Sequence, residues 1–153
     1  MVDNQAGGER EDPIRTSNGT FIPRRRDDVI SRVEDRVAKF TGLPVAHQED
    51  LQVLSYGATD QYKDHMDTLG SRNEPGAGER TMSVLMYLAD VDEGGETVFP
   101  KSDHWADERM KPPSASLSAC ARRGVSVKPR KGDALLFHDL TPTNEIDPLS
   151  MHA

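Results

Sequence analysis

The sequence predicts a mainly β domain with one flanking helix. Only one segment has a helical period: Ile30, Val33, Val37 and Phe40 recur at spacings of three and four. From residue 51 onward the apolar residues instead form short or alternating runs that turn residues separate, which is typical of strands. A chain of 153 residues with 35% hydrophobic residues has room for one domain with a modest core.

The helix has clear start and stop signals. Residues 1–20 before it are rich in Gly, Asn and charge without a period, so we expect an irregular segment over 1–14 and the domain over 15–153. Asp27 or Asp28 can cap the helix, and Gly42 followed by Pro44 ends it. The apolar stripe of this helix is predicted to pack into the core.

Five strands are expected after the helix. They cover residues 51–56, 82–88, 96–99, 124–128 and 134–137. The glycine-containing turns at 92–95 and 130–133 are predicted to be hairpin-like, because glycine takes positive φ at little cost. Residues 101–123 carry charges, serines and two prolines, and are predicted to be a long surface loop, either a lid or disordered.

The most informative side chains are His65, Asp67 and His152. Two imidazoles and one carboxylate are the ligands of a facial iron(II) site. A second His-x-acid tripeptide begins at His47, but it follows Pro44 in a polar connection, so His47 is interpreted as a surface residue. His138 is a further imidazole that can compete as a ligand, although we favour His152.

Charge and composition exclude several functions. The net charge of −7 provides no basic footprint, so no nucleic-acid partner is expected. No apolar run reaches the length of a membrane span, and the charged first residues are not a signal peptide. Cys120 is the single cysteine, so an internal disulfide is impossible.

The chain closely resembles the catalytic domain of plant and algal prolyl 4-hydroxylases, which belong to the iron- and 2-oxoglutarate-dependent dioxygenases. The matching segments are RTSNG at 15–19, LQVL at 51–54, QYKDHMD at 61–67, LMYLADV at 85–91, EGGETVFP at 93–100, CARRG at 120–124, KGDALLF at 131–137 and DPLSMH at 147–152. Few families share this ordered set, so the resemblance is specific over residues 15–152.

The resemblance implies a fold, a reaction and a site. The fold is a double-stranded β-helix, or jelly-roll, and the reaction is hydroxylation of peptidyl proline to 4-hydroxyproline with Fe(II), 2-oxoglutarate and O₂, supported by L-ascorbate. His65, Asp67 and His152 match the metal ligands, Tyr56 the cofactor-binding position, and Tyr62 and Arg80 the catalytic positions. The implied partner is a proline-rich peptide or a hydroxyproline-rich glycoprotein, and the implied location is the endoplasmic reticulum or secretory pathway.

The resemblance also has departures. The family holds the far carboxylate of 2-oxoglutarate with a basic residue, usually Lys, about ten positions after the distal histidine, whereas this sequence ends at Ala153. We therefore expect a partial domain, truncated at both ends, with an incomplete jelly-roll; Arg80, Lys128 and Arg130 are possible replacement anchors. Two alternatives stay open: a non-catalytic remnant that binds metal or proline-rich peptide, and a zinc site built from the same three ligands.

Overall fold

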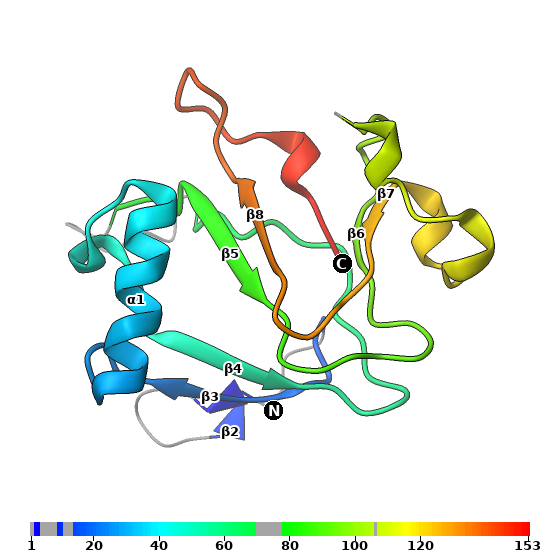
Figure 1. Cartoon of the computed structure of the whole chain (residues 1–153). Helices are drawn as coiled ribbons and strands as arrows, with labels where there is room; N and C mark the ends of the chain where they lie inside the picture. Colours follow the sequence, from blue (N-terminus) through cyan, green and yellow to red (C-terminus); the bar gives the residue numbers. More distant parts are fainter. Residues whose placement is uncertain (1, 4–8, 11–13, 70–77, 106) are drawn as a thin grey trace. The chain divides into compact units, whose positions relative to one another are not determined.

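The computed structural model describes residues 2–3, 9–10, 14–69, 78–105 and 107–153 (Figure 1). The chain forms two compact units, residues 1–62 and 63–153. Sheet is the main regular structure, and α1 is the one α-helix of the described residues, so the predicted mainly β architecture with a flanking helix is confirmed.

The first unit contains a four-stranded sheet in the order β2-β1-β3-β4. Its strands are β1 (Val2–Asp3), β2 (Glu9–Arg10), β3 (Asn18–Ile22) and β4 (Leu51–Ser55). The antiparallel pair β3 and β4 is in register from Asn18 opposite Ser55 to Ile22 opposite Leu51. Strand β4 was predicted, whereas β1, β2 and β3 were missed because residues 1–20 are charged and glycine-containing and have no strand period. Strands β1 and β2 lie in the segment 1–14, which was predicted to be irregular, so the prediction is wrong at these four residues. Residues 1, 4–8 and 11–13 of that segment lie outside the described residues.

Helix α1 (Asp28–Thr41) begins and ends where the sequence predicts. The Asp27 carboxylate accepts hydrogen bonds from the backbone N–H groups of Val29 and Ile30, both at 2.9 Å. At the other end Gly42 has a φ of 75° and donates its N–H to the carbonyl of Ala38. Both caps are local interactions, which is why the sequence alone locates them.

The packing of α1 differs from the prediction. Phe40, the last member of the expected core stripe, is 68% exposed, and the fully buried side chain of the helix is Glu34. Arg25 accounts for this burial: its backbone N–H donates to both Glu34 carboxylate oxygens at 3.2 Å, and its guanidinium lies 3.4 Å from the carboxylate. A paired carboxylate can be buried where an unpaired one cannot.

The second unit contains two small antiparallel sheets. Strand β5 (Met82–Met86) pairs with β8 (Ala134–His138), and β6 (Thr97–Phe99) pairs with β7 (Val125–Val127). The pairing is nested, because the two inner strands pair with each other and the two outer strands pair with each other (Figure 1). All four strands lie within the predicted ranges to within one or two residues.

The two glycine-containing turns do not form the hairpins that the sequence predicts. Gly94, Gly95 and Gly132 have positive φ, as predicted. However, the turn at 92–95 joins β5 to β6, and the turn at 130–133 joins β7 to β8. These strands belong to different sheets, so the turns are crossovers between sheets and the prediction of hairpins was wrong.

The predicted surface loop at 101–123 contains the short 3-10 helices η3 (Glu108–Met110), η4 (Ser114–Ser116) and η5 (Ala121–Arg123). The Glu96 carboxylate ties it to the start of β6, accepting hydrogen bonds from the backbone N–H and the hydroxyl of Ser118 at 2.8 and 2.9 Å. The buried apolar side chains of the described residues are Val98, Phe99 and Ala121, so β6 and η5 form the centre of a small core.

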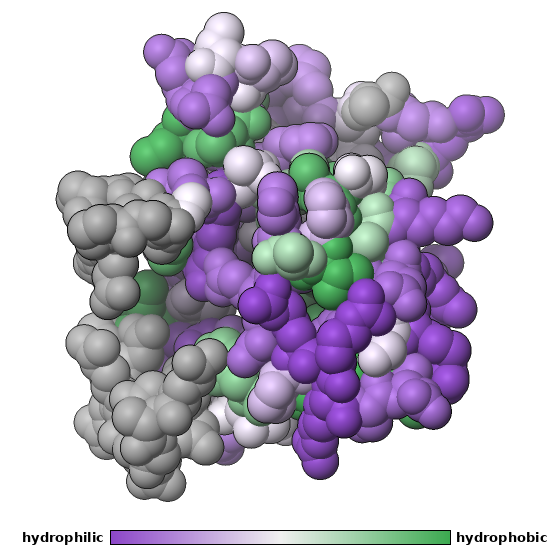
Figure 2. Space-filling model, turned by 90° about the vertical axis from the view of Figure 1, so that its left-hand side faces the viewer, coloured by the Kyte–Doolittle hydropathy of each residue, from purple (hydrophilic) through white to green (hydrophobic). Residues whose placement is uncertain are grey.

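One face of the molecule reflects the charged composition of the chain. Figure 2 shows a face on which hydrophilic side chains predominate and hydrophobic areas are small. Among the helices of the described residues, none combines the length and apolar character needed to span a membrane.

Candidate metal centre

His65 and His152 lie side by side on paired, extended backbone. The N–H of His65 donates to the carbonyl of His152 at 2.9 Å, and the N–H of His152 donates to the carbonyl of His65 at 3.0 Å. On the next residue, Ala153 exchanges two such bonds with Val98 of β6, each at 2.9 Å. His152 and Ala153 therefore connect the backbone of His65 to β6. This pairing fixes the backbone positions from which both histidine side chains project.

Both imidazoles are oriented in the same way. Nδ1 of His65 lies 2.8 Å from the carbonyl oxygen of Lys63, and Nδ1 of His152 lies 2.9 Å from that of Ser150. A carbonyl oxygen only accepts, so each Nδ1 carries the hydrogen and each Nε2 presents its lone pair when the ring is neutral. A metal-binding histidine commonly has its second nitrogen held in this way.

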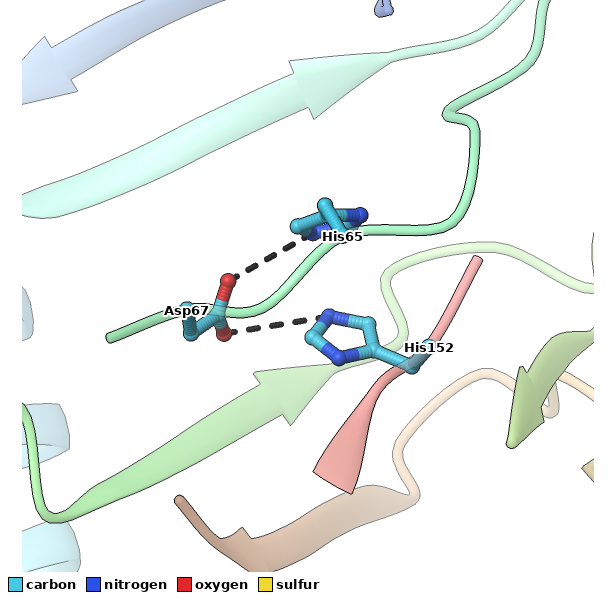
Figure 3. Close-up of side chains that lie close together, drawn as sticks. All are labelled: His65, Asp67 and His152. Atoms are coloured by element: carbon cyan, nitrogen blue, oxygen red, sulfur yellow. Dashed lines mark ion pairs between the residues drawn. The ribbon is translucent and has the colours of Figure 1, made fainter. Parts of the chain in front are cut away.

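The Asp67 carboxylate faces both rings, with one oxygen toward each (Figure 3). Its Oδ1 is 3.4 Å from Nε2 of His65 and its Oδ2 is 3.8 Å from Nε2 of His152. One ligand atom from each of the three residues falls within 4.8 Å of the others. Ligands about 2.0–2.2 Å from a shared ion stand roughly 3 Å apart when they are mutually perpendicular, so the observed spacing fits a divalent cation after a small adjustment.

The protonation states suit a metal. Burial alone would raise the pKa of Asp67, but hydrogen bonds with His65 and Ser83 and the charges of the two imidazoles outweigh it and lower this pKa to about 2. Burial is also the main reason that the pKa of His152 is lowered. At neutral pH the carboxylate is ionised and the His152 ring is neutral, which are the forms that bind metal.

Aromatic packing holds the His152 ring, whose side chain is 10% exposed. Its centroid lies 4.7 Å from that of Phe137 and 5.8 Å from that of Phe99, and the two phenylalanine rings meet edge to face at 5.1 Å. Because Phe137 and Phe99 belong to different sheets, the core of the second unit supports the ligand directly.

Several polar groups surround Asp67. Arg80 donates from Nη1 to the backbone carbonyl of Asp67 at 3.2 Å, which places this predicted residue beside the ligand. The Ser83 hydroxyl lies 2.6 Å from Asp67 Oδ2 and 3.1 Å from an oxygen of Asp139. Sequence reasoning missed Ser83 and Asp139. The available signals were a serine inside the apolar run 82–88 and an acid directly after the strand at 134–138.

The remaining candidate residues are not members of the cluster found among the described residues. Tyr56 and Tyr62 belong to the first unit, where Tyr56 is exposed and the guanidinium of Arg15 lies 5.0 Å from the centre of the Tyr62 ring. His47 is exposed in the short helix η1 (Val45–His47), in agreement with its interpretation as a surface residue. His138 is exposed at the end of β8, and it is not a member of the metal-ligand cluster found among the described residues.

Comparison with known proteins identifies relatives in a plant. The chain is similar to three proteins of Arabidopsis thaliana: probable prolyl 4-hydroxylase 3 (44% identity), probable prolyl 4-hydroxylase 10 (45%) and prolyl 4-hydroxylase 5 (43%). Each match covers 99% of this chain but 53%, 52% and 52% of the relative, so the chain spans about half the length of these relatives.

A solved structure shows the same fold. The viral collagen prolyl hydroxylase of Paramecium Bursaria Chlorella virus-1, determined as a 2OG complex, superimposes with a TM-score of 0.60 at 20% identity, over 90% of this chain and 69% of the other. The family model of the 2OG-Fe(II) oxygenase superfamily matches residues 51–153, a stretch that includes all three clustered residues. The chain therefore belongs to the 2OG-Fe(II) oxygenase superfamily.

Proposed function

We propose that the protein is an Fe(II)- and 2-oxoglutarate-dependent dioxygenase that hydroxylates peptidyl proline to 4-hydroxyproline. The observation that carries the proposal is the convergence of His65, Asp67 and His152 within 4.8 Å. Similarity to plant prolyl 4-hydroxylases supports the choice of reaction and substrate. Superfamily membership favours iron over the zinc site that the three side chains alone would also permit.

The chain's own residues prepare the site for the metal. His65 and His152 would supply Nε2 atoms, because their Nδ1 atoms are held by backbone carbonyls, and Asp67 would supply an ionised oxygen. When bound, Fe(II) supplies the redox chemistry that couples O₂ and 2-oxoglutarate to hydroxylation of a C–H bond. Phe99 and Phe137 exclude water from one side of His152.

The proposal also assigns roles to Arg80, Tyr56 and Tyr62. Arg80 is a cation beside Asp67, which supports a role toward the dicarboxylate co-substrate or the peptide. Tyr56 and Tyr62 are assigned to the co-substrate and the peptide by the resemblance to prolyl 4-hydroxylases. A peptide in the polyproline II conformation suits an aromatic-lined site, because its φ angles are already fixed and little entropy is lost on binding.

The proposal also covers the detailed fold class, the domain bounds, the reductant, the substrate and the cellular location. The nested pairing of β5 with β8 and β6 with β7 supports a double-stranded β-helix, as does the likeness in fold to the viral enzyme. We assign residues 15–153 to the oxygenase domain. By resemblance to prolyl 4-hydroxylases we further propose L-ascorbate as the reductant that maintains Fe(II), a proline-rich peptide or hydroxyproline-rich glycoprotein as substrate, and the endoplasmic reticulum or secretory pathway as location.

The test measures coupled turnover by the 153-residue chain. Succinate release from 2-oxoglutarate is followed with Fe(II) and ascorbate, with and without a proline-rich peptide, and the peptide is examined by mass spectrometry for one added oxygen at proline. We expect peptide-stimulated succinate release that His65→Ala and His152→Ala abolish. Exposed His138 supplies the matched control, and His138→Ala is expected to turn over normally.

Two results would overturn the proposal. If Fe(II) binds at the three residues while neither succinate nor hydroxylated proline forms, the chain is a binding module. If Zn(II) supports a hydrolytic reaction and Fe(II) supports none, the site is a zinc site.

A further inference from the structure

Ser83 lies between two carboxyl groups in the second unit. Its hydroxyl oxygen is 2.6 Å from Oδ2 of Asp67 and 3.1 Å from Oδ2 of Asp139. Asp67 belongs to the ligand cluster and Asp139 does not. The serine is therefore the direct link between the cluster and a second acidic side chain behind it.

The backbone fixes both members of this link. Ser83 is the second residue of β5, opposite Phe137 of β8. Asp139 follows β8 directly; its N–H donates to the carbonyl of Thr81 at 3.0 Å, and its carbonyl accepts from the N–H of Asp147 at 2.9 Å. Neither residue can move far without breaking the pairing of β5 with β8.

Asp139 is an unusual neighbour for a metal ligand. It is fully buried, and its Oδ1 has no hydrogen-bond partner among the described residues. A buried carboxyl group carries a free-energy cost that packing alone does not offset. Its other oxygen, Oδ2, is directed at Ser83, and this contact is the one hydrogen bond found for the Asp139 side chain within the described residues.

We propose that Ser83 and Asp139 are positioning residues for Asp67, with Asp139 orienting the Ser83 hydroxyl and that hydroxyl fixing the Asp67 carboxylate toward His65 and His152. This inference rests on the proposed metal site. A hydroxyl group has one hydrogen to donate, and the shorter contact assigns it to Asp67. Asp139 then acts on the oxygen of Ser83, not on the metal.

The pKa of Asp139 is consistent with its action on the Ser83 oxygen. Burial first, and the neighbouring charge of Asp67 second, raise the pKa of Asp139 to about 6. Below this pKa the Asp139 carboxyl group is protonated and can donate to the Ser83 oxygen, so that the two contacts form a chain of hydrogen bonds that ends on Asp67. Groups that orient a ligand in this way typically change metal affinity 10- to 100-fold when they are removed.

The test is a titration of the metal-free 153-residue chain with Co(II), read by visible absorption, which reports both affinity and ligand geometry. We expect Ser83→Ala to weaken Co(II) binding about 10- to 100-fold and to alter the spectrum, and Ser83→Thr, which keeps the hydroxyl, to restore both. Asp139→Ala should also weaken binding, whereas Asp139→Asn should retain it because the amide can donate to Ser83. Melting curves identify any variant that does not fold.

Two comparisons separate positioning from a general charge effect. If Asp139 acts through Ser83, the double variant Ser83→Ala/Asp139→Ala binds Co(II) no more weakly than Ser83→Ala alone. Asp133→Asn removes a negative charge from the exposed residue just before β8 and should leave binding unchanged. Equal weakening by Asp139→Ala and Asp139→Asn would show that charge matters and would overturn the inference.

Different results would refute the positioning role of Ser83 and Asp139 and the metal site itself. If Ser83→Ala and Asp139→Ala bind Co(II) with the wild-type affinity and spectrum while His152→Ala does not bind, the positioning pair is refuted and the site stands. If the wild-type chain itself binds no Co(II), the metal site is refuted and the inference with it.

Discussion

The backbones of His65 and His152 exchange two hydrogen bonds, although one residue lies near the start of the second unit and the other is next to the last residue. Their rings lie 4.2 Å apart between centroids at an angle of 58°. Formation of the ligand cluster is therefore inseparable from docking of the C-terminal residues against β6.

We expect each of the three ligands to be essential for metal binding. Replacement of His65, Asp67 or His152 by alanine should lower Co(II) affinity at least about 100-fold, because two remaining ligands hold a divalent ion poorly. The control is His138→Ala, which removes a histidine that is outside the cluster. An isothermal titration that shows weakened binding for His138→Ala and normal binding for His152→Ala would reverse the ligand assignment.

Metal affinity should fall as the pH is lowered through the range in which histidine takes up protons. The lowered pKa of His152 shifts its protonation below the ordinary value of 6.5, so this ligand is retained to lower pH than an exposed histidine would be. Asp67, with a pKa of about 2, stays ionised throughout and does not contribute. Co(II) dissociation constants measured between about pH 8 and about pH 5 check this. Affinity that is constant across this range would exclude imidazole ligands.

Asp139→Asn should stabilise the metal-free protein at neutral pH. The pKa of Asp139 is raised from 3.8 to about 6, so the folded state holds this proton more strongly than the unfolded state does. Stability is then lost as pH rises from about 4 through about 6, and the ionised carboxylate costs up to roughly 3 kcal/mol above that range. Asparagine has no such cost.

Urea unfolding of both proteins in a metal chelator measures this difference. It should approach its maximum near pH 7.5 and disappear near pH 4. Asp133→Asn, at an exposed position, should show no such pH-dependent gain. A variant that is equally or less stable than the wild type at neutral pH would mean that the buried carboxylate has a compensating partner.

Gly124→Ala should destabilise the second unit strongly. A Cβ atom at Gly124 would lie 2.8 Å from both the carbonyl carbon of Phe99 and the Cα of Pro100. These are backbone atoms that cannot move aside as a flexible side chain can, so we expect a loss of about 3 kcal/mol in the free energy of unfolding. Gly78→Ala is the control, because a Cβ there meets no atom of the described residues within 4 Å. Similar denaturation midpoints for the two variants would contradict the close approach.

The members of the cluster of His65, Asp67 and His152 could be predicted from the sequence, whereas the residues that contact Asp67 from behind could not. A pair of histidines and an aspartate are chemically distinctive, and the surrounding motifs single out His65 and Asp67. Ser83 and Asp139 carry no such local signal, because their significance comes from the pairing of β5 with β8 and from a shared contact with Asp67. Residues that act through another side chain are recognisable only once the chain is folded.

The sequence by itself determined the features that depend on near neighbours: the caps of α1 at Asp27 and Gly42, the positions of β4 to β8, and the ligand types. Tertiary structure decided which strands pair, why the glycine turns cross between sheets, and why Glu34 is buried while Phe40 is exposed. It also decided that His152 meets His65. Capping and periodicity are interactions over a few residues, whereas pairing and burial depend on segments that only the folded chain brings together.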